Sequence, residues 1–260
     1  MLSSFTVAAL DLVFPALCPV CDATLGVGRR DPLCGACWSA ITRLDPPWCD
    51  RCGAASVTRR ADPLSGRVAS HDGDARAPAP TGPCAACATK PPEYDYARSA
   101  ALYEGSLREA IHALKFSGRR ALASPLGDLT AERCARALPA DIDALIPVPL
   151  ARERERARGF NQAALLAGRI GRRLTIPVRP RWLARIRPTR PQSDLSAAER
   201  RANVRDAFGA SPRAAGRHVL VVDDVLTTGA TLDACAGALR AAGARRIGVL
   251  TVARVVHAAL

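Results

Sequence analysis

Apolar runs of strand length alternate with segments of helical spacing over residues 94–260. The clearest run is residues 219–222, four consecutive Val and Leu side chains, which is typical of a strand buried on both faces. Further strands are predicted over residues 94–103, 144–146 and 247–252, and helices over residues 106–116, 121–138, 161–173 and 232–242. Because strands and helices alternate, we expect an α/β fold: a parallel sheet flanked by helices, with ligands at the carboxyl ends of its strands.

The strand predicted at residues 219–222 runs into a short polar segment, Asp-Asp-Val-Leu-Thr-Thr-Gly-Ala-Thr at residues 223–231, and then into a helix. Backbone N–H groups of such a loop, together with the helix dipole, bind phosphate. The adjacent carboxylates repel phosphate but are suited to accept hydrogen bonds from sugar hydroxyls beside it. The segment therefore predicts a site for a ribose 5-phosphate. The alternative is an ordinary strand–loop–helix turn capped by Thr231.

A proline-constrained turn follows the strand predicted at residues 144–146. Pro147 and Pro149 stop ladder pairing there. Four arginines follow in alternation: Arg152, Arg154, Arg156 and Arg158. A rigid turn beside guanidinium groups suits a pyrophosphate, and the alternative is an arginine-rich helix start on the surface.

The next part of the chain is less periodic. Residues 177–186 predict a strand or a hood segment. Residues 187–196 are polar and contain prolines, which favours a mobile basic lid over the substrate. A helical turn is predicted at residues 197–202, and residues 204–208 are expected to lead into the last sheet region.

The charge of the chain is strongly positive and unevenly distributed. The formal net charge is +13, and residues 152–205 hold 15 arginines against four acidic residues. Such an excess favours association with polyanions. The segment is interpreted either as a site for pyrophosphate, nucleic acid or both, or as a solvated surface.

Eight of the ten cysteines form four C-x-x-C pairs: Cys18/Cys21, Cys34/Cys37, Cys49/Cys52 and Cys84/Cys87. Two such pairs complete a four-thiolate zinc site, so one or two structural Zn²⁺ ions are predicted. Sequential pairing gives two zinc ribbons, and a cross-braced pairing stays open. Disulfides and redox pairs are the alternatives. Disulfides are disfavoured because the expected compartment is reducing, and a redox role is disfavoured because the pair occurs four times. We expect residues 1–92 to form this module, with a disordered insert at 56–83, and residues 93–260 to form the α/β domain.

The chain has no run of 18 apolar residues, so no membrane insertion is expected. Residues 1–17 are apolar but lack a basic start and a clear cleavage site. They predict a short amphipathic helix that packs on the protein rather than a secretion signal. The expected compartment is therefore the cytoplasm.

Several motifs together resemble the ComF family of phosphoribosyltransferase-fold proteins. They are the double zinc ribbon, LKFSGRR at residues 114–120, IPVPL at 146–150, RARGFNQA at 156–163, Arg190-Pro191-Gln192 with Asn203 and Ala207-Phe208, and VVDDVLTTGAT at 221–231. The last motif is similar to the phosphoribosyl-pyrophosphate (PRPP) loop of type I phosphoribosyltransferases. The resemblance implies a type I phosphoribosyltransferase-like sheet and a link to uptake and processing of single-stranded DNA during competence.

The expected site residues follow from the motifs and the resemblance. Asp223 and Asp224 are the expected catalytic carboxylates and hold the ribose, with Mg²⁺ beside the pyrophosphate. The remaining PRPP contacts are expected from Thr227, Thr228, Gly229, Ala230, Thr231, Val148, Pro149 and Arg152. Nucleic-acid or pyrophosphate contacts are expected from Lys115, Arg119, Arg158, Phe160, Asn161, Gln162, Arg190 and Gln192.

Three functions are compatible with these observations. The first is a PRPP-dependent binder or a phosphoribosyltransferase with an unidentified acceptor. The second is a single-stranded DNA-binding protein on an enzyme scaffold, for which aromatic residues such as Phe116 and Trp48 could stack bases. The third is an adaptor whose ribbons bind a partner such as a competence helicase.

Overall fold

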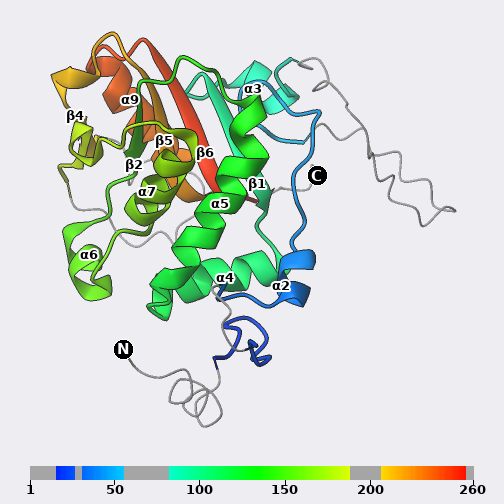
Figure 1. Cartoon of the computed structure of the whole chain (residues 1–260). Coiled ribbons are helices and arrows are strands. Elements are labelled where there is room, and N and C mark those ends of the chain that lie inside the picture. The colour runs from blue at the N-terminus through cyan, green and yellow to red at the C-terminus, as the bar shows by residue number, and fades with distance from the viewer. Residues whose placement is uncertain (1–15, 27–30, 56–81, 188–205, 256–260) are drawn as a thin grey trace, which may run out of the picture.

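The computed structural model describes residues 16–26, 31–55, 82–187 and 206–255. Its main sheet has four parallel strands in the order β1-β6-β5-β2 (Figure 1). This confirms the predicted α/β fold with a parallel sheet. The strands are β1 (Tyr96–Leu102), β2 (Ala144–Pro147), β5 (His218–Leu226) and β6 (Arg246–Arg254).

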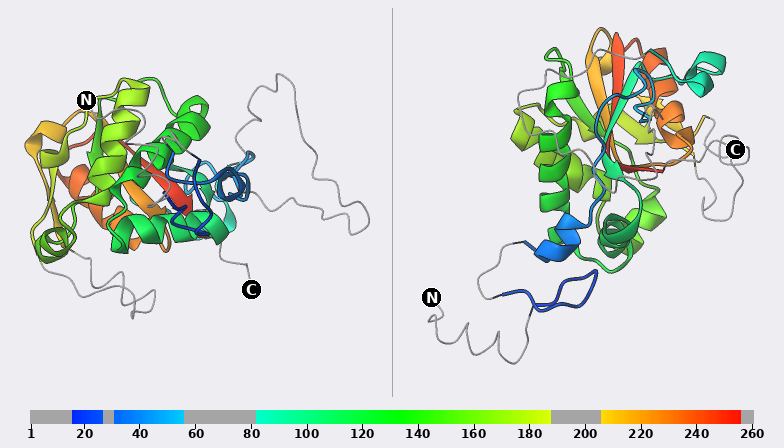
Figure 2. Two further views of the ribbon diagram at one scale, coloured as in Figure 1. Left: turned by 60° about the horizontal axis from the view of Figure 1, so that its bottom comes forward. Right: turned by 90° about the vertical axis from the view of Figure 1, so that its right-hand side faces the viewer.

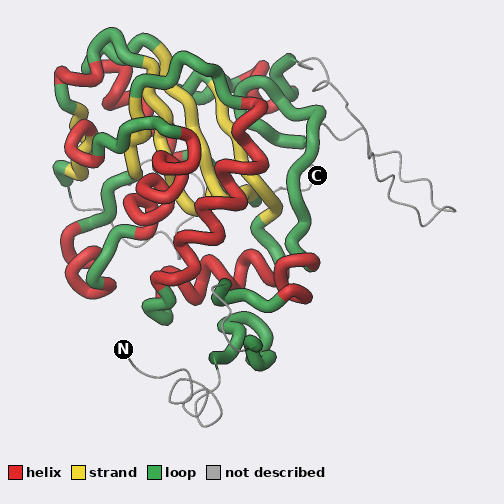
Figure 3. The backbone as a smooth tube through the Cα atoms, viewed as in Figure 1, coloured by secondary structure: helices red, strands yellow, loops and turns green. Residues whose placement is uncertain are grey.

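Each face of the sheet is covered by its own hydrophobic core. Along a strand successive side chains point to opposite faces. Leu220 and Val222 accordingly pack with helices α4 (Gly105–Phe116), α5 (Ala123–Cys134) and α7 (Gln162–Leu174). Val219 and Val221 pack on the other face with α9 (Ala230–Ala241) and a small antiparallel pair, β3 (Leu183–Arg185) and β4 (Phe208–Ala210). Figures 2 and 3 show these helices on either side of the strands.

Local chemistry explains where the helices next to the site begin and end. Helix α6 (Arg152–Arg158) is a separate short helix, because Gly159 ends it with a positive φ of 77°. Asn161 caps α7 by accepting hydrogen bonds from the N–H groups of Ala163 and Ala164 at 2.9 and 3.4 Å. The helix predicted at residues 121–138 is shorter, since α5 ends at Cys134 and a 3₁₀ turn (Ala135–Ala137) follows.

The segment at residues 204–208 was expected to lead into the last sheet region, and its described end leads into strand β4 (Phe208–Ala210). Phe208 belongs to β4, which pairs only with β3. The predicted lid beyond Arg187 and the helical turn after it lie outside the described residues. The same holds for residues 1–15 of the helix expected at residues 1–17 and for most of the insert. No helix within the described ranges is long and apolar enough to cross a bilayer.

The cysteine-rich segment packs directly on the edge strand β1. The N–H of Leu44 donates to the carbonyl of Ala100 at 3.0 Å, and the N–H of Leu102 donates to that of Thr42 at 2.9 Å. Gly53 lies so close to β1 that a Cβ there would be 2.3 Å from the carbonyl oxygen of Ala97. The segment thereby covers backbone groups that an open sheet edge would expose.

Candidate active site

Both acidic residues lie inside strand β5, which runs on to Leu226 rather than stopping at Val222. Consecutive residues of a strand point to opposite faces. Asp223 and Asp224 therefore have different surroundings although they are neighbours in sequence. The N–H of Asp224 donates to Oδ1 of Asp223 at 2.9 Å, which fixes the orientation of that carboxylate.

The loop between β5 and α9 has the geometry of an anion site. Gly229 has a φ of 79°, a left-handed conformation that favours glycine, and α9 begins at the next residue. The hydroxyl of Thr228 accepts a hydrogen bond from the N–H of Ala230 at 3.5 Å. The first-turn N–H groups of a helix lack partners within the helix and carry partial positive charge. The loop can therefore hold a phosphate.

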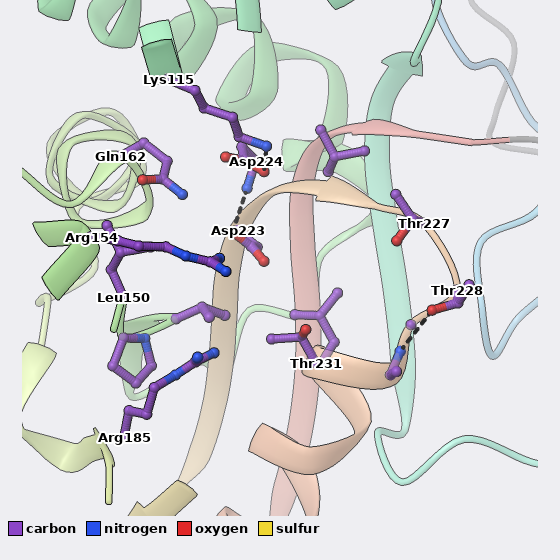
Figure 4. Close-up of a pocket in the computed structure, with 16 residues that line it drawn as sticks. Lys115, Leu150, Arg154, Gln162, Arg185, Asp223, Asp224, Thr227, Thr228 and Thr231 are labelled. Carbon is purple, nitrogen blue, oxygen red and sulfur yellow. Dashed lines mark hydrogen bonds and ion pairs between the residues drawn. The ribbon is translucent and has the colours of Figure 1, made fainter. Parts of the chain in front are cut away.

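The pocket above this loop joins residues from distant parts of the chain (Figure 4). The turn after β2 forms one wall, while Arg154 from α6 and Arg185 from β3 reach in beside it. The threonines of the loop face these guanidinium groups across Asp223. The lining consists of Lys115, Val148, Pro149, Leu150, Arg154, Gln162, Arg185, Asp223, Asp224, Val225, Thr227, Thr228, Gly229, Ala230, Thr231 and Leu232.

Lys115 forms an ion pair with Asp224 at the top of the pocket. Its Nζ lies 2.8 Å from Oδ1 of Asp224, and the side chains are 20% and 5% exposed. Burial alone lowers the pKa of the Lys115 ammonium, but the charge and hydrogen bond of Asp224, together with the charge of Asp223, outweigh it and raise that pKa. Oδ2 of Asp224 is buried and has no hydrogen-bond partner among the described residues. This oxygen is thus a buried hydrogen-bond acceptor that a ligand hydroxyl could satisfy.

Asp223 forms no ion pair with another of the described residues. Loss of water around it, followed by the charge of Asp224, raises its pKa to about 7. Lys115 and Arg185 act in the opposite direction but only in part. The acidic pair therefore holds one carboxylate that is ion-paired with Lys115 and one whose pKa lies near neutral pH.

The structure places most of the expected contacts in three groups. Lys115, Val148, Pro149 and Gln162 line the pocket with the loop residues 227–231. Arg152 lies instead in a shallow depression with Glu155 and Arg156. Arg190 and Gln192 lie outside the described residues.

The other expected contacts are not among the residues that line the pocket, and two of them already have structural roles. Asn161 donates to the carbonyl of Val148 at 3.0 Å besides capping α7, so it braces the turn. Phe160 is buried beneath the guanidinium of Arg120, 4.7 Å from the ring centre. Arg119 is exposed, and Arg158 donates to Oε1 of Gln162 at 2.5 Å.

Sequence reasoning missed two cationic residues of the pocket. Arg154 stands in the arginine run that was noted, but nothing in its spacing distinguished it from Arg152. The pairing of β3 with β4 places Arg185 in the pocket, and no sequence pattern predicts this pairing.

Replacing Lys115 with methionine is expected to lower the free energy of unfolding by about 3–5 kcal/mol, because Asp224 would keep a buried charge without a partner. Urea unfolding at pH 7 measures this. Lys90→Met is the matched control, since Lys90 is exposed and is the only other lysine. The double variant Lys115→Met/Asp224→Asn should recover much of the loss, and equal losses for Lys115→Met and Lys90→Met would contradict the prediction.

The eight C-x-x-C cysteines form two groups of four sulfurs. One group is Cys18, Cys21, Cys34 and Cys37, and the other is Cys49, Cys52, Cys84 and Cys87; within each, all sulfurs lie within 4.8 Å of one another. The pairing along the chain is therefore sequential and not cross-braced.

The spacing of the sulfurs fits zinc. A tetrahedral site with Zn–S bonds of about 2.3 Å requires sulfurs about 3.8 Å apart. The Sγ atoms of Cys18 and Cys37 are 3.8 Å apart, those of Cys21 and Cys34 3.5 Å, and those of Cys52 and Cys84 3.8 Å. Two Cys₄ clusters of this shape indicate structural zinc.

Comparisons with known proteins agree with both parts of this description. Residues 9–72 match the double zinc ribbon domain, and residues 161–259 match the phosphoribosyl transferase domain. The zinc ribbon match ends before Cys84 and Cys87, which the structure nevertheless brings to Cys49 and Cys52.

The similar proteins include three with related names. The DNA utilization protein YhgH of Shigella flexneri is 33% identical over 250 residues, which cover 94% of this chain and 99% of that protein. Competence protein F of Haemophilus influenzae is 41% identical over 115 residues, 43% of this chain and 50% of that protein. Competence protein ComFC of Bacillus subtilis is 31% identical over 142 residues, 55% and 57% of the two chains. These similarities confirm the resemblance seen in the motifs, and the chain belongs to the YhgH/ComF family, with a double zinc ribbon domain ahead of a phosphoribosyltransferase domain.

Proposed function

We propose that this protein binds PRPP with Mg²⁺ in the pocket at the end of β5 and acts in the cytoplasm on single-stranded DNA. The observation that carries the PRPP site is the placement of Asp223 and Asp224 between a phosphate-binding loop and two guanidinium groups. The two carboxylates need hydroxyl donors, and the loop and the guanidinium groups on either side of them need anions. A sugar with phosphate groups on both sides provides both, and few other ligands do.

The ligand would lie across the pocket. Its 5-phosphate would accept hydrogen bonds from backbone N–H groups of residues 227–231, and its ribose hydroxyls would donate to Asp223 and Asp224. The unpartnered Oδ2 of Asp224 is suited to one of these hydroxyls. The pyrophosphate would lie against the turn at residues 148–150 beside Arg154. Mg²⁺, a hard ion that prefers oxygen ligands, would neutralise the pyrophosphate when bound.

A second candidate is a phosphoribosyltransferase with turnover to an unidentified acceptor. The pKa of Asp223, near 7, favours it, because a carboxylate poised at neutral pH can take a proton from an incoming acceptor. Arg154 and Arg185 would stabilise the negative charge that develops on the departing pyrophosphate.

The DNA role is supported by the names of the relatives and by the charge of the chain. The relatives are called DNA utilization and competence proteins. A net charge of +13 favours a polyanionic partner. A competence helicase is a further proposed partner, for which the zinc ribbons offer a surface.

Calorimetric titration of the full chain with PRPP and MgCl₂ tests the pocket. We expect saturable binding that weakens when Mg²⁺ is removed. Ribose 5-phosphate and pyrophosphate should each bind more weakly than PRPP, because each fills only one of the two anion sites. Equal heats for PRPP and for ATP, a triphosphate with a blocked ribose C1, would contradict a PRPP site.

A further inference from the structure

Phe116 is the most exposed large apolar side chain of the described residues, at 71%. It ends helix α4 and follows directly after Lys115. Its ring is not isolated: the His112 ring packs against it edge-on with centroids 5.5 Å apart, and the Arg158 guanidinium lies 5.4 Å from its centroid. An aromatic ring held on two sides and open to solvent on the rest is a stacking surface.

This ring is linked to residues that line the proposed PRPP pocket. Lys115, one residue before it, reaches Asp224 inside the pocket. Arg158 joins the ring to Gln162, which is buried and lines the pocket. Two independent side-chain connections therefore fix Phe116 relative to the acidic pair.

The charges near Phe116 also differ from those at the opposite end of the sheet. At the amino ends of the strands, Asp141 and Asp143 pair with Arg217, Arg245 and Arg246. The loop after α4 and helix α6 carry six arginines that form no ion pair with a carboxylate of the described residues, even though Glu153 and Glu155 lie among them. These are Arg119, Arg120, Arg152, Arg154, Arg156 and Arg158.

We infer that Phe116 and Arg158 form a stacking platform for one nucleobase of a single-stranded nucleic acid, whose phosphates lie along the unpaired arginines. The inference rests on the proposed function and adds where the strand binds. Every base has a π-face, so a single ring serves any sequence, and a guanidinium beside the ring adds cation–π attraction and a phosphate contact. A duplex keeps its bases stacked on one another and cannot use such a ring. The strand would thus pass the mouth of the PRPP pocket.

The test is binding of a fluorescein-labelled oligothymidylate by the full chain, measured by anisotropy at several salt concentrations. Phe116→Ala should weaken binding about fivefold to 150-fold, the equivalent of one lost base stack. Phe116→Trp should retain or raise affinity. Ile186→Ala is the matched control, because Ile186 is 68% exposed, follows directly after β3 and does not line the pocket; it should bind as wild type.

The salt dependence separates stacking from charge. Phe116→Ala should leave the slope of log affinity against log salt unchanged, whereas Arg119→Ala should reduce it by about one. Unchanged affinity in Phe116→Ala, or the same loss in Ile186→Ala, would overturn the platform, as would equal binding of a duplex. A wild-type chain that binds the oligonucleotide but not PRPP would instead contradict the proposed pocket and leave the platform standing.

Discussion

Asp223→Asn is expected to stabilise the folded protein at pH 8 while weakening PRPP binding. In the folded state the pKa of Asp223 is raised to about 7, against an ordinary value of 3.8. Between these values the folded protein holds a proton that the unfolded chain has released. The free energy of unfolding of the wild type must therefore fall as the pH rises from about 4 to about 7.

Asparagine removes this pH dependence, because it cannot ionise. The free energy of unfolding of the variant, relative to wild type, should increase from about pH 4 to about pH 7 and then level off. The expected gain is up to about 4 kcal/mol, because each unit of pKa difference between the folded and unfolded states corresponds to about 1.4 kcal/mol. The loss of PRPP affinity should exceed about 10-fold, since a hydrogen bond to a charged group contributes about 1.5–3 kcal/mol. Urea unfolding from pH 4 to 9 and calorimetry with PRPP measure the two effects.

Asp128→Asn is the matched control. Asp128 pairs with Arg169 between α5 and α7, away from the pocket lining. Its replacement should cost stability slightly and leave PRPP binding intact. A wild-type stability that stays flat or rises between pH 4 and 7 would refute the assignment of Asp223.

Removing zinc from the second cluster is expected to be the most damaging single change to the fold. Structural zinc in small domains contributes apparent binding free energies of about 10–16 kcal/mol. This cluster also contacts the sheet, because Arg254 at the end of β6 donates to the carbonyl oxygen of Cys52. Cys52→Ala should therefore lower the zinc content from two ions to one and lower the melting temperature of the whole chain.

Zinc content by atomic absorption and melting by circular dichroism measure this result. Cys134→Ala is the control, because Cys134 is buried in α5 and belongs to neither cluster. It should keep two zinc ions and show only the cost of a small cavity. A Cys52→Ala chain that keeps two zinc ions would show that another ligand set holds the metal.

The elements of the fold were predictable because their signals are local. Val219 to Val222 is an apolar run, Asn161 is a helix cap and each C-x-x-C pair is a turn, and all of these follow from neighbouring residues. The extension of β5 to Leu226 was not predictable, since polar residues rarely continue a buried strand. The division of the chain at residue 92 stays a prediction.

Only part of the site could be predicted from the sequence, because only part of it is formed by neighbouring residues. Its phosphate loop is one continuous motif, so the pattern predicts it. The pair of Lys115 with Asp224 joins residues more than a hundred positions apart, and Lys115 was expected to contact a ligand rather than to neutralise an acid. This contact depends on how α4 packs against one face of the sheet. No local sequence pattern predicts that packing.

The place of β6 between β1 and β5 has a consequence for how the protein is assembled. Tyr96 in β1 pairs with Gly248, so the edge of β1 that faces β6 stays unpaired until nearly the whole domain has been synthesised. Until then, the edges of β1 and β5 that face β6 lack hydrogen-bond partners. Such open strand edges can pair with other chains, which favours aggregation. The cysteine-rich segment is synthesised earlier and pairs with the outer edge of β1, so it can leave β1 with one open edge rather than two.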